Sequence, residues 1–121
     1  MYMYNLKIKR IYDIPEKNDG YRILVDRLWP RGVSKENAHL DLWLKEVSPS
    51  PDLRKWFNHE PEKFNEFSKK YIQELKHNDA VSQITDKLKN HNVTLLYAAK
   101  DPKINHAIVL QNFILKKFFK S

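Results

Sequence analysis

The sequence predicts a single α/β domain in which helices pack on a small parallel or mixed sheet. Short apolar segments rich in strand-forming residues alternate with longer segments whose apolar residues recur at helical spacing. The composition, 41% hydrophobic and 31% charged over 121 residues, suits one globular core. No repeat, linker or low-complexity segment interrupts the chain, so we expect one domain over residues 1–121.

Four segments are expected to form the strands. Residues 5–12 show broken alternation, which predicts a strand with one apolar and one solvated face. Residues 21–26 form a short apolar run after a turn at residues 18–20. Residues 40–46 alternate with a period of two, although a short helix also fits this segment. Residues 93–98 are apolar on both faces, which predicts a central strand.

Four helices are expected between and after these strands. Ser50, followed by Pro and Asp, is typical of a helix start, and further helices are predicted over residues 61–76 and 80–90. The last helix is predicted over residues 102–119, with Asp101 as its cap. Apolar residues surround most of its circumference, which indicates either burial or contact with a partner.

The composition excludes several classes of function. The chain has no Cys, which rules out disulfides, thiolate nucleophiles and iron–sulfur clusters. Its 2 Gly cannot form a glycine-rich phosphate loop. The 5 His show no metal-binding spacing, so we expect no metal site, and no pattern identifies a cofactor. Because the sequence lacks a signal peptide and an apolar run of bilayer length, we expect a cytoplasmic protein without membrane contact.

Basic residues follow the predicted strands. If these strands are parallel, their carboxyl ends meet at one edge of the sheet, where ligands bind in open α/β folds. We therefore expect an anion-binding group there, formed by Arg27, Arg31, Arg54 and Lys100. Guanidinium groups and free backbone N–H groups at helix starts are suited to phosphate or carboxylate.

Asp26 and His106 are the candidate catalytic residues at the same edge. Asp26 would act as a base or nucleophile and His106 as an acid. The alternatives are an ion pair between Asp26 and a neighbouring arginine, and a structural, hydrogen-bonded His106. We expect six further residues to support this site, although each could instead have only a structural role. They are Trp29, Ser50, Trp56, His59, Asp101 and Asn105.

Several segments resemble one known family. The stretch from Gly20 to Gly32, which includes the sequence VDRLWPRG, the segments at residues 43–50, 53–59 and 95–101, and Asn105-His106-Ala107 are similar to the YeaO-like domain-of-unknown-function family of small bacterial proteins. The similarity covers about residues 5 to 116 and implies a compact α/β domain without an agreed activity. Glu60 departs from the pattern, since the family has Asp there and Glu caps a helix less well.

Three functions remain open at this stage. The first is a site that binds a small phosphate- or nucleotide-type ligand and that could also catalyse its hydrolysis or a group transfer. The second is a nucleic-acid-binding module, suggested by the net charge of +7. The third is a protein-interaction domain that uses the apolar last helix, which ends in Phe118 and Phe119. Neither the occurrence of a reaction nor the oligomeric state follows from the sequence.

Overall fold

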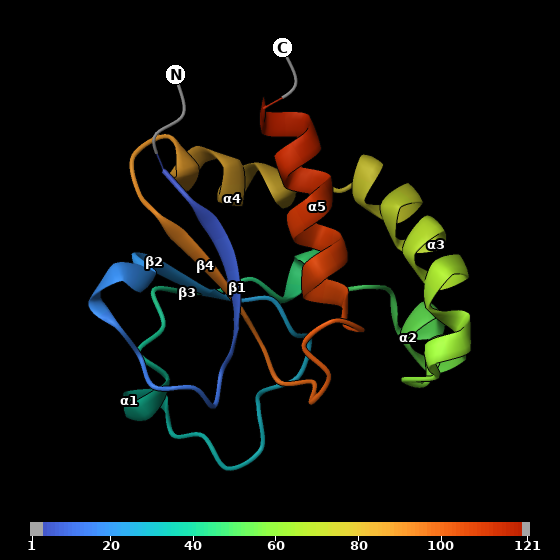
Figure 1. Cartoon of the computed structure of the whole chain (residues 1–121), viewed down its shortest axis with the longest axis horizontal. Coiled ribbons are helices and arrows are strands. Elements are labelled where there is room, and N and C mark those ends of the chain that lie inside the picture. Colours follow the sequence, from blue (N-terminus) through green and yellow to red (C-terminus); the bar gives the residue numbers. More distant parts are fainter. Residues whose placement is uncertain (1–3, 120–121) are drawn as a thin grey trace.

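The computed structural model of the chain describes residues 4–119, with side chains through Lys117 (Figure 1). Its strands are β1 (Leu6–Arg10), β2 (Tyr21–Leu24), β3 (Leu42–Trp43) and β4 (Val93–Tyr97). Its α-helices are α1 (Lys35–Ala38), α2 (Pro51–Phe57), α3 (Phe64–Lys76), α4 (Val81–Leu88) and α5 (His106–Phe119). Single 3-10 turns lie at η1 (Lys17–Asp19), η2 (Lys45–Val47) and η3 (Pro61–Lys63).

The sheet is parallel throughout, with the strand order β1-β4-β2-β3. Residues 93–98 were expected to form a central strand, and β4 is buried at all five positions between β1 and β2. The predicted α/β class is therefore confirmed. All described strands also end at the same edge of the sheet.

Successive residues of the inner strands enter different cores, as the pleat requires. Ile23 and Leu95 belong to the large core, which α2, α3, α4 and α5 cover. Leu24 and Leu96 point to the opposite face and pack with Ile11 in a smaller core beneath α1 and the loop after β2. In Figure 1, α5 lies between the strands and α3, while α1 lies away from this helical layer.

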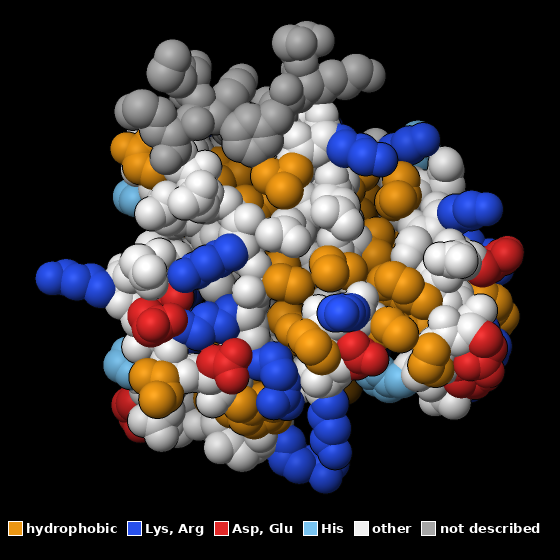
Figure 2. All heavy atoms as spheres, viewed as in Figure 1, with side chains coloured by type: hydrophobic (Ala, Val, Ile, Leu, Met, Phe, Trp, Pro, Cys, Tyr) orange, Lys and Arg blue, Asp and Glu red, His pale blue; other side chains and the backbone are white. Residues whose placement is uncertain are grey.

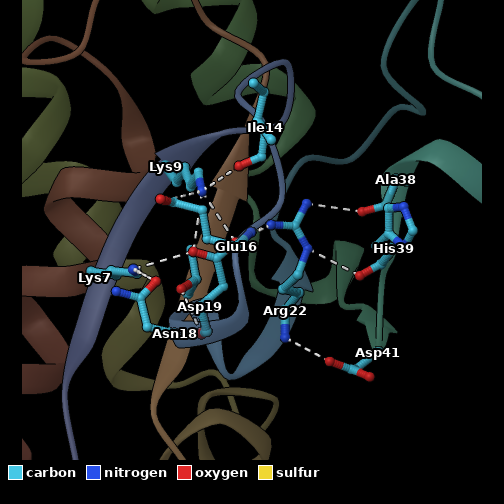
Figure 3. A network of polar contacts seen from close by, with 11 residues as sticks. Lys7, Lys9, Ile14, Glu16, Asn18, Asp19, Arg22, Ala38, His39 and Asp41 are labelled. Atoms are coloured by element: carbon cyan, nitrogen blue, oxygen red, sulfur yellow. Dashed lines mark hydrogen bonds and ion pairs between the residues drawn. The ribbon is translucent and has the colours of Figure 1, made fainter.

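A buried ion network occupies the polar part of the opposite face (Figure 3). The side chain of Asp19 is fully buried and pairs with Arg22, Lys7 and Lys9. The Arg22 guanidinium also donates to the carbonyl oxygens of Ala38 and His39, at 2.9 and 3.0 Å. One face of β1 was expected to be solvated. Instead, η1 covers part of this face, where Lys7 and Lys9 of β1 pair with the buried carboxylate of Asp19.

Gly20, which joins η1 to β2, lies against the backbone of the neighbouring loop. Its φ is +68°, and a Cβ atom there would lie 2.1 Å from the carbonyl oxygen of Asn92. Only glycine fits both the backbone conformation and this close approach. The turn predicted at residues 18–20 is therefore present, and its glycine is required for a tertiary contact as well.

Two predicted elements differ from the structure. The strand expected over residues 40–46 consists of Leu42–Trp43 only, and the 3-10 turn η2 follows it. The last helix begins at His106 and not at residue 102, because Asn105 is its cap: the Asn105 Oδ1 accepts from the Ile108 amide at 2.9 Å. Asp101 instead closes a turn, with its carboxylate accepting from the amides of residues 103 and 104.

Helix α5 is apolar around its circumference because it packs between the sheet and α3. Ala107, Leu110 and Ile114 are fully buried, and further apolar residues of the helix pack against the same core. The side chains of Phe118 and Phe119 lie outside the described residues. Among the helices that the structure describes, none combines the length and apolarity needed to cross a membrane.

Candidate functional site

Asp26 and Arg27 join the carboxyl ends of the inner strands to the segments beside them. The Asp26 Oδ2 accepts from the Ala98 amide at 3.0 Å, just after β4, and the Asp26 carbonyl accepts from the Trp43 indole at 2.8 Å. The Arg27 Nη2 donates to the carbonyl of Pro49 at 3.1 Å. These bonds fix the edge of the sheet at which the predicted site was placed.

His106, the first residue of α5, contacts the same edge. Its Nε2 lies 3.0 Å from the Val25 carbonyl and 3.3 Å from the Asp26 Oδ1. Because both neighbours are acceptors, Nε2 carries a hydrogen, and in the neutral imidazole Nδ1 is then the free acceptor. The ring also meets Tyr71 edge-on, with 6.2 Å between centroids. The hydrogen-bonded position considered for His106 is therefore present, and its role as an acid stays a prediction.

Burial shifts both partners toward their neutral forms. It raises the pKa of Asp26, although the charge of a protonated His106 and the Ala98 amide oppose that rise. Burial lowers the pKa of His106; the nearby charges of Arg54 and His59 lower it further, and the Asp26 carboxylate opposes them. At neutral pH, His106 is therefore an uncharged imidazole at the edge of a basic cavity.

This cavity, which we name the arginine cavity, has a volume of about 500 Å³. Three guanidinium groups line it, those of Arg27, Arg31 and Arg54, against the single carboxylate of Asp26. Those of Arg31 and Arg54 form no hydrogen bond or ion pair with any residue from 4 to 117. Both of these side chains are exposed. Seven of the predicted site residues line this cavity: Asp26, Arg27, Trp29, Arg31, Arg54, His59 and His106.

Two buried polar atoms beside the arginine cavity have no hydrogen-bond partner within the described part of the chain. They are the Arg27 Nε and the Asp26 Oδ1, which lies 3.3 Å from the His106 Nε2 but forms no hydrogen bond with it. An unpaired buried polar atom costs about 1–3 kcal/mol, and such atoms persist in native structures where function requires them. Both atoms belong to the residues that begin the loop after β2.

A second cavity adjoins the first across a shared wall. This phenylalanine cavity, of about 330 Å³, is lined by Phe57 and Phe67 and shares Arg54, His59 and His106 with the arginine cavity. His59 is held in the left-handed region at φ 55°, directly after Asn58 at φ 49°. Two consecutive residues in this conformation are energetically costly, and such strain collects at ligand sites.

Lys100 and Asp101 do not line the arginine cavity. They line a third cavity of about 400 Å³, which also touches His59. The expected grouping of Lys100 with the three arginines is therefore not found, because the chain turns away after Ala99. Asn105 lines the phenylalanine cavity, where both ends of its side chain are already bonded as the α5 cap.

Ser50 and Trp56 lie outside the three cavities. Ser50 caps α2 as expected, accepting from the Leu53 amide while its hydroxyl donates to Glu74 at 2.6 Å. Trp56 is on the surface of α2, with the ammonium groups of Lys63 and Lys70 over its ring. The polar group of Ser50 and the ring of Trp56 are therefore both engaged by neighbouring residues of the fold.

The structure adds Tyr12 and Asn58 to the candidate site. Tyr12 lines the arginine cavity. Its hydroxyl donates to the carbonyl of Arg31 at 2.9 Å, and this bond holds the loop after β2 in position. Tyr12 ends the first predicted strand, so its place at the common edge could have been expected. Asn58 gave no signal, because its position depends on how α2 ends. No group of three or more potential metal ligands occurs among the described residues.

Comparison with known proteins identifies the family of the chain. A family model described as "Inactive DUF488-N3 subclade" matches residues 5–121. The chain belongs to this YeaO-like family of unknown function. The uncharacterized protein YeaO of Escherichia coli (strain K12) is 46% identical over 111 residues, covering 91% of this chain and 96% of that protein. The uncharacterized protein Rv3073c of Mycobacterium tuberculosis (strain ATCC 25618 / H37Rv) is 35% identical over 109 residues, covering 90% and 92%. No solved structure matches the chain.

Proposed function

We propose that the chain binds a small anionic ligand of the phosphate or nucleotide type in the arginine cavity. The observation that carries the proposal is the set of three arginines around one cavity, two of which have no side-chain hydrogen bond or ion pair with residues 4–117. A volume of about 500 Å³ lies within the usual range of small-molecule sites. Each charge-assisted hydrogen bond from these groups would contribute about 1.5–3 kcal/mol to binding.

The proposed function is binding without turnover. The matching subclade carries the word "inactive" in its description, and the Nε2 of His106 is engaged by a backbone carbonyl. Asp26 and His106 would then shape the edge of the site and adjust its charge. Hydrolase or transferase chemistry, with Asp26 as base or nucleophile and His106 as acid, would instead release a product that NMR spectroscopy of the incubated ligand detects.

A thermal-stability screen tests the proposal. Its panel contains phosphate, pyrophosphate, sugar phosphates, nucleotides, divalent metals and short oligonucleotides. A ligand at 100 times its dissociation constant adds about 2.7 kcal/mol, which should raise the melting temperature by several degrees. Arg31→Ala and Arg54→Ala should each weaken that ligand by about tenfold or more. Lys89→Ala, which removes an exposed cation beyond α4, is the matched control.

The screen also separates the proposal from its alternatives. Figure 2 shows Lys and Arg in several separate places on this face, with acidic side chains between them, which gives little support to a nucleic-acid surface. A shift with oligonucleotides alone would nevertheless favour the nucleic-acid-binding module. A flat response to the whole panel would count against the arginine cavity as a ligand site and favour a protein partner.

A further inference from the structure

The shared wall between two cavities sets the shape of the ligand. Arg54, His59 and His106 line both the arginine cavity and the phenylalanine cavity, so the two spaces meet at these side chains. A ligand whose anion lies beside Arg31 can extend past Arg54 without crossing the core. Inorganic phosphate would fill only one of the two spaces.

The two cavities differ in chemistry. The phenylalanine cavity has no carboxylate in its lining, and its unshared lining includes Pro51, Lys55 and the buried Phe57 and Phe67. Phe57 and Phe67 stack on each other with 4.2 Å between centroids, which makes that wall rigid and apolar. Asn58 supplies an exposed amide at its rim. Such a space offers apolar contacts to a planar, heteroatom-bearing ring, which can meet aromatic side chains edge-on, and an amide can bond the ring's edge.

The middle of the site is polar. Arg54 and His59 are exposed there and offer hydrogen-bond donors to whatever joins the two ends of the ligand. A hydroxylated linker such as a pentose would meet these groups. The order from one end to the other is therefore guanidinium groups, polar side chains and an apolar wall.

We propose that the ligand is a nucleoside monophosphate or a close analogue, with its phosphate beside Arg27 and Arg31 and its base in the phenylalanine cavity. This inference rests on the proposed function and adds the base-binding half of the site. It assigns the contacts of the base to the end of α2, around Asn58, and those of the phosphate to the loop after β2.

Amide NMR spectroscopy of the full chain tests this placement. The probes are inorganic phosphate, ribose 5-phosphate, adenosine 5′-monophosphate and uridine 5′-monophosphate. Phosphate and ribose 5-phosphate should shift the amides of Leu28 and Arg31 only. At least one nucleotide should also shift those of Lys55 and Asn58, and bind about tenfold or more tightly than ribose 5-phosphate.

Asn58→Gly provides a second measurement, because glycine keeps the left-handed backbone at this position and removes the amide together with its 3.4 Å hydrogen bond to Glu60. It should weaken the nucleotide and leave ribose 5-phosphate unchanged. If both nucleotides match ribose 5-phosphate in affinity and in the amides shifted, or if Asn58→Gly does not separate them, the inference is wrong while the phosphate site stands. If none of the probes shifts Leu28 and Arg31, the proposed function fails and the inference fails with it.

Discussion

Replacing Asp19 with asparagine would test whether the buried ion network stabilises the fold. Burial alone would raise the pKa of Asp19, but the Glu16 amide and the cations of Lys9, Lys7 and Arg22 lower it to about 2. Against 3.8 for an unperturbed aspartate, this corresponds to about 2 kcal/mol of stability at neutral pH, since one pKa unit equals about 1.4 kcal/mol. The Asp19→Asn variant also leaves the buried Arg22 without its counter-charge, so we expect a total loss of about 3–5 kcal/mol.

The pH dependence gives the sign of this effect. Because the folded-state pKa of Asp19 lies below 3.8, its contribution is complete above that pH and is lost as the pH falls through about 2. Urea unfolding at pH 7 and at pH 2 should therefore show a difference between wild type and Asp19→Asn that shrinks by about 1–2 kcal/mol at the lower pH. Taking the difference between the two proteins cancels the titration of the other carboxylates.

Glu16→Gln is the control for this experiment. Glu16 pairs with Lys9 at 2.9 Å but is exposed, so its loss should cost no more than about 1 kcal/mol. Equal destabilisation by Asp19→Asn at pH 7 and pH 2, or a loss as small as that of Glu16→Gln, would refute the reasoning.

Two further predictions concern the turn before β2 and the candidate site. Gly20→Ala should destabilise the fold by more than the roughly 1–2 kcal/mol expected for Gly32→Ala, since both have positive φ but only Gly20 meets the Asn92 carbonyl; equal melting temperatures would contradict this. Sulfate, whose charge is constant from pH 8 to pH 5.5, should bind more tightly as the pH falls. An anion beside Arg54 favours protonation of His106, whose pKa burial lowers in the free protein, so binding takes up a proton. Calorimetry should show that His106→Gln abolishes this trend, and a pH-independent wild-type affinity would contradict it.

Periodicity predicted the elements that are long or buried. Residues 93–98 contain strand-forming residues on both faces, and β4 occupies the centre of the sheet for that reason. The alternation of residues 40–46 was less informative, because a two-residue strand followed by a 3-10 turn gives almost the same pattern. The start of α5 was missed because Asp101-Pro102 and Asn105 are both acceptable caps in sequence, and only the packing of the helix decides between them.

The candidate site was predictable as far as topology determines it. Asp26, Arg27 and His106 lie together because parallel strands end at one edge, which the sequence already indicated. Lys100 was misplaced, since the direction of a loop beyond the strand depends on contacts that no local pattern encodes. The pairing of Asp19 with Lys7 and Lys9 could have been predicted. The two lysines are two residues apart and so lie on one face of β1, and Asp19 belongs to the turn that follows this strand.

The position of β4 has a consequence for biosynthesis. Both β1 and β2 pair with β4, and they make no ladder with each other, although β4 is the last strand to leave the ribosome. A nascent chain that ends before residue 93 can form only the short pairing of β2 with β3. Sheet assembly therefore waits until β4 has been made. The hydrogen bond from the Thr94 hydroxyl to the Asp19 carbonyl then joins residues more than 70 positions apart. Such long-range closure slows folding, and it leaves β1 unpaired until β4 emerges.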